Sequence, residues 1–161
     1  NKFVPDVQLI ADISYAIKKN NTSVLMYPEA SYSFDGRATK LPRGLGILFK
    51  RLNVPVVMIT TYGSFTRDPL YNNLQKRSID VSAEIRCLLT PEECRSLKAP
   101  EIDAILDDAF SFDYFKWQQD NNITINESFR ADGLNRILYK CPCCRQEGQT
   151  EGKGINIYTH A

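Results

Sequence analysis

The sequence has little histidine, no long apolar run and almost no net charge. Among its 161 residues the one histidine is His160, next to the C-terminal Ala161. A mechanism that needs a histidine general base elsewhere in the chain is therefore excluded. No apolar run approaches the roughly 18 residues that a membrane-spanning helix needs, and residues 1–19 mix charges throughout, unlike a signal peptide. The formal net charge of +1 creates no global field that would favour nucleic acid or an anionic membrane.

The five cysteines are unevenly spread, which is not typical of a disulfide scaffold. Cys87 and Cys94 stand apart, whereas Cys141, Cys143 and Cys144 are crowded together. Small secreted domains space their cysteines across the chain, so the clustering favours a reduced compartment. Cys87 lies in an alternating apolar and polar segment, and we interpret it as a small core residue rather than as a nucleophile.

Apolar periodicity predicts an α/β fold with a mainly parallel sheet flanked by helices. The spacing predicts a helix over 7–18, and short apolar runs predict buried strands over 23–27 and 54–60. A polar loop over 29–44 and a short helix over 45–51 are expected between the two strands. The order helix, strand, loop, helix, strand is typical of α/β proteins.

The later part of the chain is expected to be a strand, then helices, then a small tail. Residues 79–87 alternate strictly, which predicts a half-exposed strand. Thr90 is a predicted helix cap, and a longer helix is predicted over 100–117, with its aromatic side chains interpreted as core packing. The predicted domains are 1–90, the C-terminal part of an α/β domain; 91–133, an acidic helical segment; and 134–161, a small cysteine-containing tail.

A carboxylate followed by a cationic loop marks the end of the first predicted strand. Glu29 comes after this strand, at the edge where open α/β sheets bind ligands. Arg37, Lys40 and Arg43 follow in the loop and could hold a phosphate. Arg43 is favoured because it precedes Gly44 and a helix start, where backbone donors also attract anions. The alternative is a structural network in which Glu29 pairs with a loop arginine and the other cations are solvated.

The stretch Val24–Ser33 resembles the Phe-Pro-Glu-Gly-Thr-Arg-Ser block of the glycerolipid acyltransferases, especially 1-acyl-glycerol-3-phosphate acyltransferase. The segment Val54-Pro55-Val56-Val57 resembles the next block of that family, at a fitting distance along the chain. The resemblance covers about residues 1–90. It implies transfer of an acyl group from acyl-CoA or acyl carrier protein to a lysophospholipid acceptor in phospholipid biosynthesis, with peripheral contact at the cytoplasmic face of a membrane.

Two departures from the family qualify this expectation. The family's His-x-x-x-x-Asp block, which supplies the base, is absent here, so no catalytic residue is assigned, and we expect a C-terminal part of a longer enzyme that is inactive alone. The family's phosphate-binding arginine maps onto Tyr32, which is uncharged at neutral pH; its glycine maps onto Ala30. An acyltransferase-like protein without activity is therefore an alternative. The candidate substrate-binding residues are Glu29, which would position substrate or order the loop, with Ser31, Tyr32, Arg37, Lys40 and Arg43.

The segment Cys141-Pro142-Cys143-Cys144 has the spacing of a zinc knuckle. Thiolates of Cys141 and Cys144 could reach one tetrahedral Zn²⁺. A zinc ribbon has a second pair about 15–20 residues further along, and none is present here. Three interpretations stay open: a second pair beyond Ala161, a local site completed by Cys143 and His160, or free thiols.

The tail thus resembles a truncated zinc ribbon, and structural zinc is the one cofactor that the sequence suggests. The reaction itself implies none. An alternative function is a non-catalytic module that uses the knuckle and the basic loop to bind protein or nucleic acid. For the acyltransferase interpretation, nucleic acid is not an expected partner, because the net charge is only +1.

Overall fold

A computed structural model describes residues 6–159, which divide into two compact units. The first unit comprises residues 6–32, 38–59 and 85–111. The second unit comprises the remaining described residues, 33–37, 60–84 and 112–159. Within the described part of the chain, no helix combines the length and the apolar character needed to cross a bilayer.

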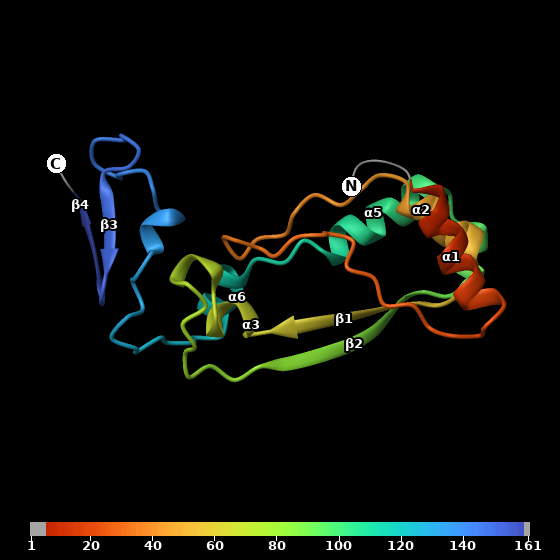
Figure 1. The fold of residues 1–161 in the computed structure, drawn as a ribbon, viewed down its shortest axis with the longest axis horizontal. Coiled ribbons are helices and arrows are strands. Elements are labelled where there is room, and N and C mark those ends of the chain that lie inside the picture. Colours follow the sequence, from red (N-terminus) through yellow and green to blue (C-terminus); the bar gives the residue numbers. More distant parts are fainter. Residues whose placement is uncertain (1–5, 160–161) are drawn as a thin grey trace. The chain divides into compact units, whose positions relative to one another are not determined.

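The described residues form helices and strands that follow one another in no regular alternation (Figure 1). Two of the helices, η1 and η2, are single turns of 3₁₀ type. In chain order the elements are α1 (Val7–Lys18), α2 (Leu45–Leu52), β1 (Val56–Tyr62), α3 (Ser64–Arg67), η1 (Leu70–Asn72), β2 (Ser82–Leu89), α4 (Pro91–Ser96), α5 (Ala99–Ala109), α6 (Tyr114–Asp120), η2 (Leu134–Arg136), β3 (Thr150–Lys153) and β4 (Asn156–Thr159).

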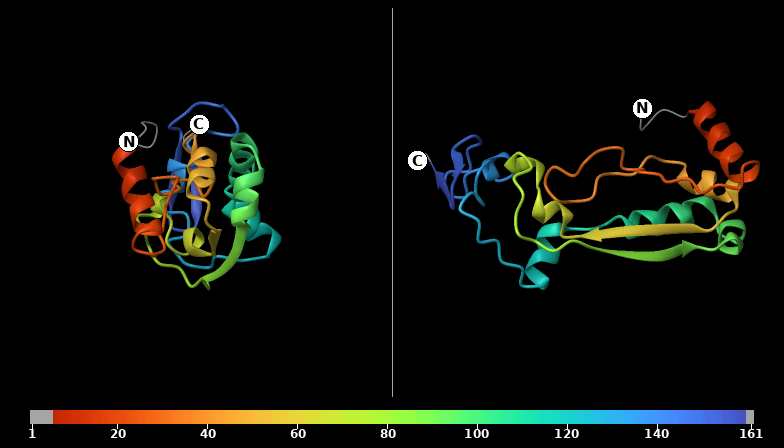
Figure 2. Two further views of the ribbon diagram at one scale, coloured as in Figure 1. Left: turned by 90° about the vertical axis from the view of Figure 1, so that its right-hand side faces the viewer. Right: turned by 60° about the horizontal axis from the view of Figure 1, so that its bottom comes forward.

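The predicted α/β fold with a mainly parallel sheet is wrong. The described residues form two sheets of two strands each, β1 with β2 and β3 with β4. The arrows of β1 and β2 run in opposite directions in Figure 2, and β3 pairs antiparallel with β4, with Gly152 opposite Ile157. Because both pairs are antiparallel, the described residues contain no parallel sheet edge of the kind at which Glu29 was expected to lie.

The segment 23–27, predicted to be a buried strand, is not a strand in the structure. Its Leu25 is 69% exposed and its Tyr27 is 78% exposed. An apolar run becomes a strand only where a neighbouring strand completes the hydrogen-bond ladder, and no described segment pairs with it. The strand predicted over 79–87 is present as β2, but it starts and ends later, at Ser82 and Leu89. Cys87, which was interpreted as a small core residue, is exposed on this strand.

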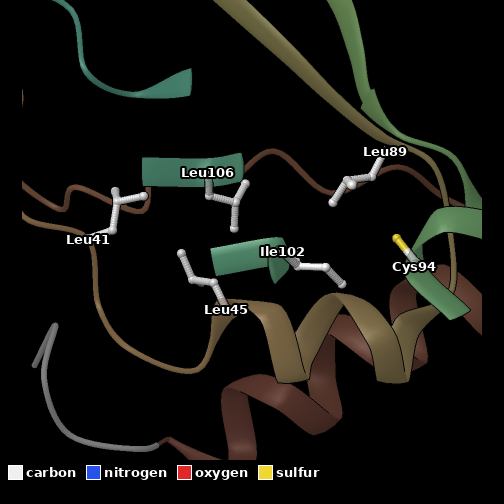
Figure 3. Packing of buried hydrophobic residues seen from close by; sticks show 6 residues of the cluster. All are labelled: Leu41, Leu45, Leu89, Cys94, Ile102 and Leu106. Carbon is white, nitrogen blue, oxygen red and sulfur yellow. The ribbon is translucent and has the colours of Figure 1, made fainter. Parts of the chain in front are cut away.

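The first unit is built on the packing of α2 against α5. Residues four apart on α5, Ile102 and Leu106, present one apolar stripe, as a helical period requires. The buried side chains gather between the helices and the end of β2 (Figure 3); they are Leu41, Leu45, Leu89, Cys94, Ile102 and Leu106. Gly46 of α2 lies where α5 begins, and its amide donates to Oδ1 of Asp103 at 2.7 Å. The helices therefore approach closely.

The helix start predicted at Thr90 is confirmed. The Thr90 hydroxyl accepts from the Glu93 amide at 3.2 Å, and the Thr90 amide donates to the Glu93 carboxylate at 2.7 Å, a reciprocal capping box. The hydrogen bond from the Thr90 amide lowers the pKa of Glu93. At the other end of α4, Lys50 Nζ donates to the carbonyls of Cys94 and Arg95, so one cation of α2 satisfies free carbonyls of α4.

The single helix predicted over 100–117 is wrong. The first helix, α5, ends at Ala109, and a second helix, α6, begins at Tyr114. Asp113 caps α6 by accepting from the Lys116 amide at 3.0 Å. Serine and aspartate compete for backbone groups and favour such caps over helix interiors. The aromatic residues that follow pack against one another in the second unit: Phe112 meets Tyr114 edge-on, with 4.6 Å between ring centroids. Phe112, Tyr114 and Trp117 are partly buried and Phe115 is exposed, so none of these side chains lies in a fully buried core.

Candidate functional site

Glu29 holds a second segment of the first unit in place. Its Oε1 accepts from the Thr39 backbone amide at 2.7 Å and from the Thr39 hydroxyl at 3.1 Å. The two residues are ten positions apart, and the carboxylate is half-buried. Hydrogen bonds to an ionised acceptor are about twice as strong as neutral ones. Glu29 therefore joins residues 6–32 to residues 38–59, and we call this contact the Glu29 clasp.

The residue after Glu29 adopts a backbone conformation that favours glycine. Ala30 has φ of +51°, its amide donates to the Tyr27 carbonyl at 3.0 Å, and the Ser31 hydroxyl donates to the Glu29 carbonyl at 3.3 Å. A non-glycine residue in the left-handed region costs roughly 1–2 kcal/mol. Ala30 is also the position onto which the acyltransferase family's glycine maps, so the turn there has the shape that a glycine would suit.

Ala30→Gly is expected to leave the free energy of unfolding unchanged or to raise it by up to about 1 kcal/mol. The strain released at φ +51° offsets the extra entropy that glycine loses on folding. Ala104→Gly is the matched control, because Ala104 is exposed in the regular α5 helix and should cost about 1 kcal/mol. Urea unfolding curves of both variants give the comparison. A loss for Ala30→Gly as large as that for Ala104→Gly contradicts a left-handed turn at Ala30.

The predicted cations of the loop differ in their surroundings. Arg37 belongs to the second unit, where its Nε lies 3.6 Å from a carboxylate oxygen of Asp113. Lys40 and Arg43 belong to the first unit, are exposed, and make no side-chain hydrogen bond or ion pair with any residue between 6 and 159. Tyr32 is 87% exposed. Lys40 and Arg43 are thus the cations that are open to an anionic ligand.

The N-terminus of α2, next to Arg43, already binds a carboxylate of the protein itself. The Gly46 amide, which has no carbonyl partner within the first turn of α2, donates to the Asp103 carboxylate at 2.7 Å. A helix N-terminus attracts negative charge, and here α5 supplies it. The roles of Asp103 and Thr39 could not be predicted from the sequence, because their contacts join residues 57 and 10 positions apart. No spacing rule relates residues at such distances.

The cysteine segment forms a closed turn in the second unit. The Cys141 amide donates to the Gln146 carbonyl at 3.0 Å, and the Arg145 amide donates to the Cys141 carbonyl at 3.0 Å. Arg145 has φ of +62°, which turns the chain back, and Lys140 forms an antiparallel bridge with Glu147. We call residues 141–146 the cysteine knuckle. Within it Cys141 is buried, whereas Cys143 and Cys144 are exposed.

The sulfur of Cys141 is the focus of the cysteine knuckle. Hydrogen bonds from the backbone amides of Cys144 and Cys143 lower the pKa of the Cys141 thiol, and the thiols of the same two residues act in the same direction. Between residues 6 and 159, no three or more His, Cys, Asp or Glu side chains form a complete metal-binding group. The predicted ligand His160 lies outside the described residues.

The site features therefore consist of the Glu29 clasp with two open cations in the first unit, and the cysteine knuckle in the second. Comparison of the sequence with models of protein families and with curated proteins, and of the structure with solved structures, finds no match.

Proposed function

We propose that this chain carries the acceptor-binding part of a glycerolipid acyltransferase. The protein would move an acyl group from acyl-CoA or acyl carrier protein to a hydroxyl of 1-acyl-glycerol-3-phosphate or a similar acceptor. The observation that carries the proposal is the Glu29 clasp, in which the carboxylate of the Pro-Glu block accepts hydrogen bonds from the backbone amide and the hydroxyl of Thr39. The left-handed Ala30 next to it supports the same alignment with the family's glycine.

In this proposal Glu29 orders the loop rather than acting as the base. Its Oε1 already accepts two hydrogen bonds from Thr39, which is the arrangement of a structural carboxylate. Lys40 follows Thr39 directly, so the clasp also limits where the Lys40 chain segment can lie. Lys40 and Arg43 then supply the positive charge for the acceptor's phosphate. Tyr32 supplies a hydroxyl where the family has a cation.

The chemistry requires a base, and residues 1–161 contain no His-x-x-x-x-Asp block to supply one. The acceptor hydroxyl would attack the thioester carbonyl, lose its proton to the base, and form the new carbon–oxygen bond while the carbon–sulfur bond breaks. The thiolate of the carrier leaves and takes up a proton. In the family that the sequence resembles, a His-x-x-x-x-Asp block supplies the base, and the reaction takes place at the cytoplasmic face of a membrane, with which the protein would make peripheral contact.

The test uses the full-length protein that carries this chain, with an acyl-CoA and lysophosphatidate. Glu29→Gln should lower kcat/KM about tenfold, or about 1.4 kcal/mol, mainly through a higher KM for lysophosphatidate, because the loop that places the cations loosens. Thr39→Val should act in the same direction. The double variant should be no worse than Glu29→Gln alone, since both changes break one contact.

Glu92→Gln is the matched control, because Glu92 is an exposed carboxylate in the first turn of α4. It should leave both kinetic constants unchanged. Full activity of Glu29→Gln contradicts the role of the clasp. Absence of acyl transfer by the wild-type protein with acyl-CoA and with acyl carrier protein as donors contradicts the proposed function as a whole.

A further inference from the structure

β2 has an edge that no other described strand covers. Among residues 6–159 its sheet contains only β1 and β2, and the isolated bridges of the described residues lie elsewhere, at Arg37 and Lys140. β1 runs along one edge of β2 (Figure 1). The backbone N–H and C=O groups of the opposite edge therefore have no strand partner within residues 6–159. Such an edge is a template for pairing with another chain.

The side chains of β2 are exposed as well as its edge. The six consecutive residues from Ser82 to Cys87 are all exposed, and Ile85 among them is 70% exposed. A β-branched apolar side chain in a strand gains its stabilisation from packing against cross-strand neighbours. An exposed isoleucine beside an open strand edge therefore favours a further strand as the partner of β2.

Two opposite charges flank Ile85 symmetrically along the strand. Glu84 precedes it and Arg86 follows it. The Glu84 carboxylate accepts from the neutral Tyr62 hydroxyl at 2.8 Å, and Arg86 makes no side-chain hydrogen bond or ion pair with any residue between 6 and 159. Neither charge is thus paired with an opposite charge in the described part of the chain, and a carboxylate can accept more than one hydrogen bond.

We propose that β2 pairs antiparallel with β2 of a second copy of this chain, with Ile85 opposite the partner's Ile85. Because the two strands run in opposite directions, Glu84 then faces the partner's Arg86, and Arg86 faces the partner's Glu84. Residues directly opposite each other have Cβ atoms about 4.5–5.5 Å apart, so both pairs can form ion pairs. Successive side chains alternate between the faces of a strand, which places Ala83 opposite the partner's Cys87 on the face that carries Ile85.

Charge complementarity selects both this register and this occupant. Antiparallel pairing centred on Glu84 or on Arg86 sets like charges opposite each other, which is destabilising, and so does parallel pairing in register. Pairing centred on Ile85 forms the same ion pair twice, as a two-fold interface requires, because each copy presents the same surface. Edge strands that resist association carry charges that repel a second copy, whereas the charges of β2 attract one. This proposal is independent of the acyltransferase proposal.

Sedimentation velocity of the full chain under reducing conditions tests the pairing. The wild-type chain should change from monomer to dimer across about 5 to 500 µM, because one strand edge buries less area than a standard interface. Glu84→Arg and Arg86→Glu should each raise the dissociation constant at least tenfold, since each replaces two ion pairs by two repulsions. The double exchange should return to within about threefold of wild type. Asp107→Arg, an equal charge change at an exposed position of α5, should have no effect.

Disulfide cross-linking gives a second readout of the register. On mild oxidation, Ala83→Cys should form a disulfide with the partner's Cys87, which mass spectrometry of the linked peptides identifies. Within one strand, positions 83 and 87 lie about 13 Å apart, too far for a disulfide, so this bond joins two copies. Ser82→Cys is the matched control, because its side chain points to the other face of the strand, opposite the partner's Leu88.

Four results would overturn the proposal. The first is a wild-type chain that stays monomeric over the whole concentration range. The second is dimerisation that Glu84→Arg and Arg86→Glu leave as strong as in wild type, and the third is a double exchange that dimerises as weakly as the single variants. The fourth is a Ser82→Cys variant that links to Cys87 as efficiently as Ala83→Cys does, because the register would then be wrong.

Discussion

Gly46→Ala is expected to lower the free energy of unfolding of the first unit by about 3 kcal/mol, although glycine to alanine usually stabilises a helix. A Cβ built on Gly46 overlaps the carbonyl oxygen of Ala99, lies 2.9 Å from its carbonyl carbon, and lies 3.0 Å from Oδ1 of Asp103. Backbone atoms cannot rotate away as a side chain can. Alanine therefore forces α2 and α5 apart and strains the Gly46–Asp103 hydrogen bond.

Urea unfolding followed by far-ultraviolet circular dichroism measures this loss. Gly44→Ala is the control, because a Cβ at Gly44 meets nothing within 4 Å but the residue has φ of +91°. That variant should lose only about 1 to 2 kcal/mol, from backbone strain. A neutral or stabilising result for Gly46→Ala would mean that α2 and α5 are not packed through this glycine.

Arg77→Met is expected to destabilise the second unit by about 3 kcal/mol, because it removes a buried charged donor and leaves its acceptors unpaired. Arg77 is 3% exposed. Its guanidinium donates to the Thr66 carbonyl at 3.2 Å, the Tyr71 hydroxyl at 2.9 Å and the Arg130 carbonyl at 3.1 Å. Methionine fills much of the volume but leaves these acceptors without a donor. One side chain thus ties three segments of the second unit together.

Two further variants separate the hydrogen bonds of Arg77 from its charge and size. Arg77→Lys should lose somewhat less than Arg77→Met, because an ammonium keeps the charge but cannot span all three acceptors. Lys76→Met, at the exposed neighbouring position, should stay within about 0.5 kcal/mol of wild type. Urea unfolding compares the three. A loss below 1 kcal/mol for Arg77→Met would show that the guanidinium network does not support the second unit.

Local signals predicted several elements well. The helix that starts after Asp6, the helix start at Thr90 and the short helix over 45–51 are predicted from caps and apolar spacing, and the structure confirms them. Each of these signals depends on interactions between residues that are only a few positions apart in the sequence. The helix predicted over 100–117 was wrong for a related reason: its apolar spacing continues past Ala109, but Asp113 caps a new helix.

Strand pairing could not be predicted from the same information. An apolar run such as 23–27 has the composition of a buried strand whether or not a partner exists, and here no described segment pairs with it. The parallel sheet was inferred from element order alone, whereas β1 pairs antiparallel with β2 and β3 pairs antiparallel with β4. Pairing depends on which distant backbone groups meet, and composition does not encode this.

The candidate sites divide in the same way. Glu29 and the cysteine knuckle were identified from the sequence, because a carboxylate after an apolar run and a C-x-x-C pair carry their chemistry in their own residues. Their partners were not. Asp103 lies 57 positions from the amide it accepts from, and Thr39 lies 10 positions from Glu29.

The sequence by itself therefore determined where chemistry is available in this protein: one carboxylate, a run of cations and three clustered thiols. Only the tertiary structure decided which of these groups are held in place and which stay open. The physical reason is that side-chain chemistry belongs to the residue, whereas hydrogen-bond partners and burial are set by chain segments that meet only on folding. Glu29 thus holds the Thr39 segment in place, Lys40 and Arg43 are open, and Cys141 is buried.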